Sequence, residues 1–309
     1  MQALLDVILP VFVVIGAGYL AVWLKWFSQD GVEGLMRFAQ NFAIPCLLFT
    51  ALSQLDLGQG FDAGLLLSFY AGALAGFVIG LLGARLIFGR PWEDAIVIGF
   101  CCLFSNTVLL GLQLTEQAYG PDALTANYAI IALHSPFCYG VGISVMEITR
   151  ARGAAGAEVA RRVFKAMFTN ALIIGIGLGL LVNVTGLALP VTLQEGLDLI
   201  SRAALPAALF GMGGVLAQYR PEGDLRVIAW ICLVALVVHP LITRTLGGAF
   251  ALEDAAIRSA VLSAAMAPGA NAYIFANMYG RAKRVAASAV LIGTALSIFS
   301  AWLWMGLLP

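Results

Sequence analysis

Long apolar runs alternate with short polar segments along the whole chain. A helix needs about 20 mostly apolar residues to cross a membrane. Charged residues and clusters of Gly and Pro divide this sequence into ten runs of roughly that length. The pattern therefore predicts ten transmembrane helices, which we number 1 to 10 in chain order. Their expected ranges are 4–24, 36–54, 63–86, 95–114, 124–149, 162–185, 198–217, 225–247, 255–276 and 284–308.

The composition also indicates a membrane environment. Hydrophobic residues make up 61% of the 309 residues and charged residues only 11%, and the mean hydropathy is +0.94. So few charges could not cover a water-soluble surface. The sequence thus predicts an all-α polytopic protein of the lipid bilayer, in the cell membrane, which in a bacterium is the inner membrane.

The sequence predicts no metal, cofactor or nucleic acid as a partner. The cysteines all fall inside apolar runs, and we interpret them as small buried side chains (Cys46, Cys101, Cys102, Cys138 and Cys232). The formal net charge is zero, and no basic run is interleaved with aromatic residues. Nucleic-acid binding would require such a basic surface.

Cations are distributed unevenly over the connections between the predicted helices. Of the 17 Lys and Arg residues, all but Arg202, Arg244 and Arg258 fall in connections 1–2, 3–4, 5–6, 7–8 and 9–10. By the positive-inside rule these connections are cytoplasmic, which leaves both termini outside.

The chain contains a repeat of about half its length. Residues 93–120 and 253–280 both open with Glu-Asp-Ala and close with Tyr-Gly at an offset of 160. The repeat divides the chain into a first five-helix half (1–149), a short cytoplasmic linker (150–161) and a second half (162–309). Because five is odd, the second half enters the membrane upside down. Such inverted repeats are typical of secondary transporters.

Two predicted helices at equivalent places in the halves carry residues that disfavour a continuous helix. Pro lacks the backbone donor, Gly costs about 1 kcal/mol in a helix interior, and Asn prefers local backbone bonding. An interrupted helix inside a membrane is tolerated mainly where it lines a polar cavity. The free amides at the start of each half-helix would favour an anionic oxygen. The predicted substrate-binding residues are Ser105, Asn106 and Thr107 in helix 4, and Pro268, Gly269 and Asn271 in helix 9.

Other polar and helix-bending residues lie inside the spans. We interpret Pro45 and Pro206 as structural kinks in helices 2 and 7. His134, beside an expected break at Ser135-Pro136, is a further substrate-binding candidate, whereas His239 is interpreted as a histidine hydrogen-bonded to a neighbouring helix. Arg258, near the outer end of helix 9, either attracts anions or only reaches the interface.

Helix 3 presents a glycine face, G-x-x-x-G-x-x-x-G, at positions 72, 76 and 80. Such a face allows close helix packing. The packing is expected within the protein, and a homodimer is the alternative.

Several motifs together resemble the auxin efflux carrier family, which includes the plant PIN exporters and bacterial organic-acid permeases. The resemblance covers almost the whole chain. It rests on Asn41-Phe42-Ala43-Ile44-Pro45, Ser105-Asn106-Thr107-Val108 with Gly111, Asn170 with Pro190, Leu205-Pro206 with Gly213, and Asn271 with Tyr279-Gly280.

The resemblance implies a scaffold of helices 1, 2, 6 and 7 and a transport domain of helices 3–5 and 8–10, with helices 4 and 9 broken and crossing. It also implies a carboxylate held near the crossing by Asn106, with His134 nearby. The sequence departs from the family at three places. Ser105 stands where Pro is common, Pro268 lies one position later than expected, and Asn170 is followed by Ala171 instead of Pro.

Together these features predict a secondary transporter of a small mono- or dicarboxylate, auxin-like or malonate-like, with alternating access at the crossing. The coupling ion, a proton or sodium, stays open. A sodium-coupled bile-acid-type symporter of the same superfamily is the alternative, although no buried carboxylate is expected to hold the ion. A membrane-embedded enzyme lacks any catalytic motif, and a channel lacks rings of like charge. No catalytic residue is predicted.

Overall fold

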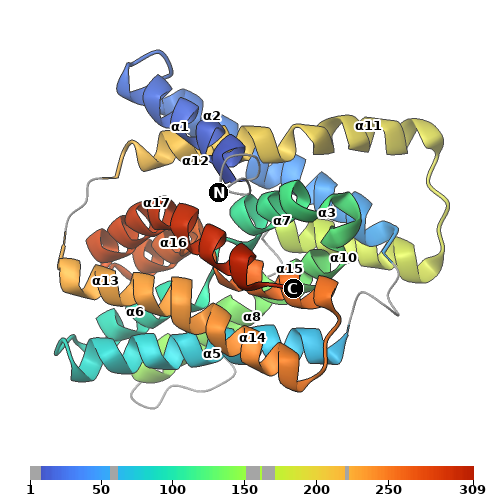
Figure 1. The fold of residues 1–309 in the computed structure, drawn as a ribbon. Coiled ribbons are helices and arrows are strands. Elements are labelled where there is room, and N and C mark those ends of the chain that lie inside the picture. The colour runs from blue at the N-terminus through green and yellow to red at the C-terminus, as the bar shows by residue number, and fades with distance from the viewer. Residues whose placement is uncertain (1–7, 56–61, 151–160, 162–170, 220–222) are drawn as a thin grey trace. The chain divides into compact units, whose positions relative to one another are not determined.

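The computed structural model describes residues 8–55, 62–150, 161, 171–219 and 223–309. Within these ranges the protein is helical (Figure 1), and its only β-type pairing is a single antiparallel bridge between Ser105 and Pro268. In the part of the chain that the structure describes, six helices are long and apolar enough to cross a membrane, and two shorter apolar helices accompany them. The predicted linker, 150–161, lies almost entirely outside the described residues.

The chain forms two compact units. Unit 1 comprises residues 1–9, 61–163 and 219–309, and unit 2 comprises residues 10–60 and 164–218. The helices of unit 1 are α5 (Ala63–Leu86), α6 (Trp92–Leu103), the π-helix η3 (Thr107–Leu112), α7 (Gln113–Tyr119), the 3-10 helix η4 (Pro121–Leu124), α8 (Thr125–Arg150), α13 (Leu225–Leu233), the π-helix η5 (Val234–Val238), α14 (His239–Ala249), α15 (Asp254–Ala264), α16 (Ala270–Tyr279) and α17 (Lys283–Leu307).

The core of unit 1 is formed where α5, α8 and α15 pack together. Its fully buried side chains include Phe69, Ile130 and Ala264. Further along α5, a Cβ added at Gly72 would meet Thr243 of α14, and one added at Gly80 would meet Cys102 of α6. The predicted glycine face thus packs inside unit 1, where α14 lies beside α5 (Figure 1).

Ion pairs tie the first turn of α6 to the ends of α8 and α16. The Glu93 carboxylate lies 2.8 Å from Arg150 Nε and 2.9 Å from an Arg281 nitrogen, and Asp94 pairs with Arg281 at 3.0 Å. Arg150 also donates to the Tyr279 carbonyl and lies over the Tyr279 ring. These contacts hold α6, α8 and α16 together at one end of the unit.

Asp224 begins α13 as its N-cap, outside the apolar span. Its carboxylate accepts hydrogen bonds from the Arg226 amide at 3.0 Å and from Arg90 at 2.7 Å. The amide and then the Arg90 guanidinium favour the charged form, so the pKa of Asp224 is lowered from its ordinary value.

Unit 2 contains α1 (Leu9–Trp23, from Pro10 onward), α2 (Gln29–Phe38), the π-helix η2 (Ala39–Ala43), α3 (Ile44–Ser53), α10 (Ala171–Thr185), α11 (Val191–Arg202) and α12 (Ala204–Leu216). Small residues allow its helices to touch backbone to backbone. A Cβ added at Gly18 would lie 1.9 Å from the Phe210 carbonyl oxygen, and one at Gly175 would lie 2.6 Å from the Pro45 carbonyl oxygen. Larger side chains at either position would force these helices apart.

The three prolines expected to bend helices behave differently. Pro45 follows the π-helix η2, and Pro206 lies in the first turn of α12, just after α11 ends at Arg202. Helix α8, however, continues through Pro136 without a break. The expected interruption at Ser135-Pro136 is therefore wrong. A proline removes one helical hydrogen bond, but a long helix packed against its neighbours can retain its other bonds.

Candidate functional site

Two chain interruptions pair with each other inside unit 1. The chain leaves helical geometry after Leu103, at the end of α6, and again after Ala264, at the end of α15. Between them the Asn106 amide donates to the Ala267 carbonyl at 2.8 Å, and the Gly269 amide donates to the Phe104 carbonyl at 2.9 Å. Backbone groups in a membrane interior need such partners. The two interruptions therefore satisfy each other where neither could form helical bonds.

Asn106 is the N-cap of the helix that follows the first interruption. Its side-chain oxygen accepts a hydrogen bond from the Leu109 amide at 3.3 Å, and its carbonyl accepts from the Leu110 and Gly111 amides. Asparagine is among the best residues at this position because its short side chain replaces a missing helical acceptor. Asn106 and its neighbours Ser105 and Thr107 are all buried.

The second interruption leads into α16, whose N-cap is Gly269 in an extended conformation. Asn271, in the first turn of α16, accepts a hydrogen bond from the Tyr139 hydroxyl of α8 at 3.0 Å. A Cβ built on Gly269 would lie 3.6 Å from the Asn106 Cα. The caps of both following helices are therefore in contact, and their first amides lie in the same part of unit 1.

Helix α17 supports the second interruption. The Ala267 amide donates to the Ser297 hydroxyl at 3.0 Å, and Ser297 in turn donates to the Gly293 carbonyl at 2.9 Å. Gly293 has no side chain, and a Cβ there would approach the Pro268 ring to 3.0 Å. Gly293 and Ser297 thus give Pro268 room and satisfy the amide before it.

His134 lies beside the first interruption. Its Nε2 is 3.1 Å from the Ser105 carbonyl oxygen, and its ring packs edge-on against Phe104 with 4.7 Å between centroids. The Cys138 sulfur is 3.8 Å from His134 Nδ1. His134 therefore contacts the backbone of the interruption and helps to position it.

The structure brings seven predicted site residues together in unit 1. These are Ser105, Asn106, Thr107, His134, Pro268, Gly269 and Asn271. Pro45 and Pro206 both belong to unit 2. The buried polar side chains of the described residues include no Asp, Glu, Lys or Arg. The local electrostatic potential at the site is therefore set by helix ends, amides and hydroxyls, and helix N-termini favour an anion.

Sequence reasoning missed Tyr139 and Ser297, which both support the second interruption. Tyr139 follows His134 by five residues on α8, whereas residues on one helix face are three or four apart, so this spacing gave no signal. Ser297 carries no signal either. It is one of several serines in an apolar helix, and its bond to Ala267 joins positions 30 residues apart.

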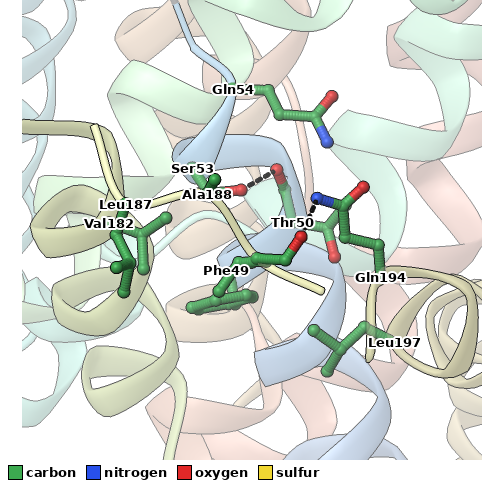
Figure 2. Close-up of a pocket in the computed structure, with 10 residues that line it drawn as sticks. Phe49, Thr50, Ser53, Gln54, Val182, Leu187, Ala188, Gln194 and Leu197 are labelled. Atoms are coloured by element: carbon green, nitrogen blue, oxygen red, sulfur yellow. Dashed lines mark hydrogen bonds between the residues drawn. The ribbon is translucent and has the colours of Figure 1, made fainter. Parts of the chain in front are cut away.

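Unit 2 has a pocket of its own, with a volume of about 200 Å³ (Figure 2). It lies between the end of α3, the end of α10 and the start of α11. Ser53 donates to the Thr50 carbonyl at 2.8 Å, and Gln194 donates to the Leu189 carbonyl at 3.1 Å. The polar groups in this pocket are neutral amides and hydroxyls, and it shares no residue with the predicted site.

Comparison with known proteins agrees with a membrane transport role. The family model described as "Membrane transport protein" matches residues 3–305. The chain is 26% identical to the "Putative malonate transporter" of Rhizobium meliloti over 96% of this chain and 93% of that protein. It is 22% identical to "Uncharacterized transporter YfdV" of Escherichia coli (96% and 95% covered) and 22% identical to "Auxin efflux carrier component 8" of Arabidopsis thaliana (94% and 93% covered).

Proposed function

The chain belongs to the membrane transport protein family, that of the auxin efflux carriers, and we propose that this membrane transporter carries a small organic anion. It is a transporter and not an enzyme. The substrate is a mono- or dicarboxylate, malonate-like or auxin-like, and it binds at the paired interruptions of unit 1.

One observation carries this proposal: the caps of two interrupted helices, Asn106 and Gly269, lie against each other in a buried, uncharged environment. A carboxylate there would accept hydrogen bonds from helix N-terminal amides and from the Asn271 side chain. Binding through dipoles and amides, without a buried Arg or Lys, is strong enough to select an anion and weak enough to release it.

Transport would follow from motion of unit 1 against unit 2. Unit 1 contains the segments proposed as helices 3–5 and 8–10, and unit 2 contains those proposed as helices 1, 2, 6 and 7. This division supports a transport domain and a scaffold. In our proposal the ten helices form two inverted five-helix repeats, and an elevator-like displacement of unit 1 exposes the site alternately to each side.

Both termini lie outside the cytoplasm in this proposal. The excess of Lys and Arg in alternate connections supports that orientation. A cysteine introduced between positions 153 and 157, in a background without native cysteines, should react with an impermeant reagent only from the cytoplasmic side. Labelling from outside would reverse the orientation.

Ligand-induced thermal stabilisation tests the substrate class. A ligand that binds the folded state raises its apparent stability once its concentration exceeds the dissociation constant. We expect malonate and related carboxylates to raise the Tm of the purified protein and malonamide, a neutral analogue of similar size, to leave it unchanged. Stabilisation by neutral compounds alone would contradict an anion transporter.

A further inference from the structure

His239 lies in unit 1 without the hydrogen bonds that a buried imidazole needs. Its side chain is 0% exposed, and neither ring nitrogen has a hydrogen-bond partner among the described residues. The Phe69 carbonyl faces the ring but makes no bond of acceptable distance and angle. The expectation that His239 is hydrogen-bonded to a neighbouring helix is therefore wrong.

A second unpartnered polar group lies beside it. Thr243, one helical turn later on α14, is 1% exposed, and its hydroxyl also lacks a partner. Both side chains face Gly72 of α5. The position of a Cβ on Gly72 is 2.5 Å from Thr243 Oγ1 and 3.1 Å from His239 Cδ2. Two adjacent buried polar groups without protein partners indicate a place where a further species, such as a water molecule or a proton, binds.

The freed backbone carbonyl before His239 has partners, in contrast to the His239 side chain. The π-helix η5 ends at Val238, and Pro240 deprives the Leu236 carbonyl of its helical donor. That carbonyl instead accepts hydrogen bonds from the Ser300 hydroxyl at 3.0 Å and the Trp304 indole at 2.9 Å. Short π-helical turns are frequent at functional sites. Helix α17 thus holds this turn in place and leaves the imidazole unbonded.

His239 lies close to the proposed substrate site. The Phe69 ring contacts both histidines, with its centroid 5.3 Å from that of His239 and 5.7 Å from that of His134. On another side, a Cβ on Gly76 would meet both the His239 Cβ at 3.8 Å and the Cys102 carbonyl at 3.0 Å. Cys102 is the second-last residue of α6, directly before the first interruption. A charge on His239 would therefore act on an anion bound there.

We propose that His239 binds the proton that is carried together with the anionic substrate, with Thr243 as its hydrogen-bond partner. The link to transport rests on the proposed function. A proton from the aqueous phase adds to a ring nitrogen, and the imidazolium then donates to Thr243 or to the Phe69 carbonyl. The substrate carboxylate supplies the balancing negative charge, and the proton leaves again when the substrate does.

No other group is as well suited to this role. Among the described residues, the titratable side chains that share the Phe69 ring with His239 are His134 from α8 and Tyr70 from α5, and Cys102 from α6 meets it at Gly76. His134 already contacts the Ser105 carbonyl, and Tyr70 donates to the Ile130 carbonyl. Helix α14 itself carries half-buried Arg244, and α15 carries its charged residues, Asp254 and Arg258, in its first two turns. No carboxylate of the described residues is buried beside the ring.

Malonate transport in proteoliposomes separates this inference from the proposed function. Exchange of labelled malonate without a pH gradient tests the transporter alone. With an inward proton gradient we expect the native protein to accumulate malonate several-fold and His239→Gln to retain exchange but lose that accumulation. The matched variant His134→Gln should bind malonate more weakly and keep its gradient response. The inference would be overturned if His239→Gln and the native protein accumulated malonate equally, or if the proton gradient did not change accumulation by the native protein.

A titration of the purified protein tests the proton site without a transport measurement. The chain has only two histidines, so NMR of protein labelled with ¹⁵N-histidine gives two imidazole signals, and His134→Gln assigns them. We expect malonate to increase the protonated fraction of the His239 imidazole. An imidazole that stays neutral throughout, with and without malonate, would contradict a proton site even if malonate exchange succeeds.

Discussion

The two interruptions of unit 1 occur in matching segments but are supported in different ways. The first is capped by its own side chain, since Asn106 accepts the Leu109 amide, while the nearby Ser105 hydroxyl has no partner among the described residues. The second depends on other helices: Tyr139 of α8 binds Asn271, and Ser297 of α17 binds the Ala267 amide. The first interruption thus combines its own cap with a contact from His134 of α8, whereas the side-chain support of the second comes from other helices.

The two segments also differ at their N-terminal ends, away from the interruptions. Glu93 and Asp94 begin α6 and pair with Arg150 and Arg281. Their repeat mates at an offset of 160 are Glu253 and Asp254, which are exposed at the start of α15. One end of unit 1 therefore carries an ion-pair network. At the other end, Arg258 lies over the Tyr119 ring and donates a hydrogen bond to the carbonyl of Pro309. The comparison teaches that a duplicated sequence can keep its helix breaks while each copy acquires its own partners.

The largest expected effect comes from replacing Asn106, which caps a helix and is a predicted substrate-binding residue. Asn106→Ala should weaken malonate affinity about 10- to 150-fold, the loss expected for a charge-assisted hydrogen bond of about 1.5 to 3 kcal/mol. It should also lose about 0.5 to 2 kcal/mol of stability, since the cap is removed. Asn106→Ser keeps a capping oxygen and should lose affinity only. Calorimetry and thermal unfolding measure the two effects, and native affinity in both variants would remove Asn106 from the site.

Ser297 and Ser105 offer a matched test of stability. Ser297→Ala leaves the buried Ala267 amide without an acceptor and should cost about 1 to 3 kcal/mol, whereas Ser105→Ala removes an unpartnered hydroxyl and should be close to neutral. Thermal unfolding in detergent gives both values. Equal losses would mean that the two interruptions are supported alike.

Tyr139→Phe should have a smaller effect, confined to the second interruption. Loss of a neutral hydrogen bond of about 0.5 to 1.5 kcal/mol should weaken malonate binding about 2- to 12-fold by freeing the Asn271 side chain. In an Asn271→Ala background the same change should have little further effect, because the bond is already absent. Full additivity in this double-mutant cycle would show that Tyr139 acts independently of Asn271.

The smallest effect should distinguish the two ends of unit 1. Arg281→Gln breaks two partly exposed ion pairs and should lower stability by about 1 kcal/mol or less, with the loss shrinking at high salt. Arg258→Gln lies at the end without such a network, so its effect should depend less on salt. The same salt dependence for both would contradict the difference between the ends.

Local residue types predicted the class of protein well. The alternation of apolar runs and charged connections identified a helical membrane transporter, and the combined motifs identified its family. The sequence placed polar and helix-breaking residues near 106 and 268, where the structure has non-helical backbone between α6 and η3 and between α15 and α16. The predictions for Pro136 and His239 failed, because the effect of a proline or the bonding of a histidine depends on which helices surround it.

By itself the sequence determined that the chain is apolar enough for a bilayer, that a segment recurs at an offset of 160, and where helix formation is locally unfavourable. These properties follow from hydropathy and backbone chemistry within a few residues. Only the tertiary structure decided the partners. In the repeat, the position equivalent to Asn271 is Gly111 and not Asn106. In the structure, Ser105 forms its bridge with Pro268 and not with its repeat mate, Ala265. Hydrogen bonds between segments more than 100 residues apart depend on how the helices pack, and no local pattern records that packing.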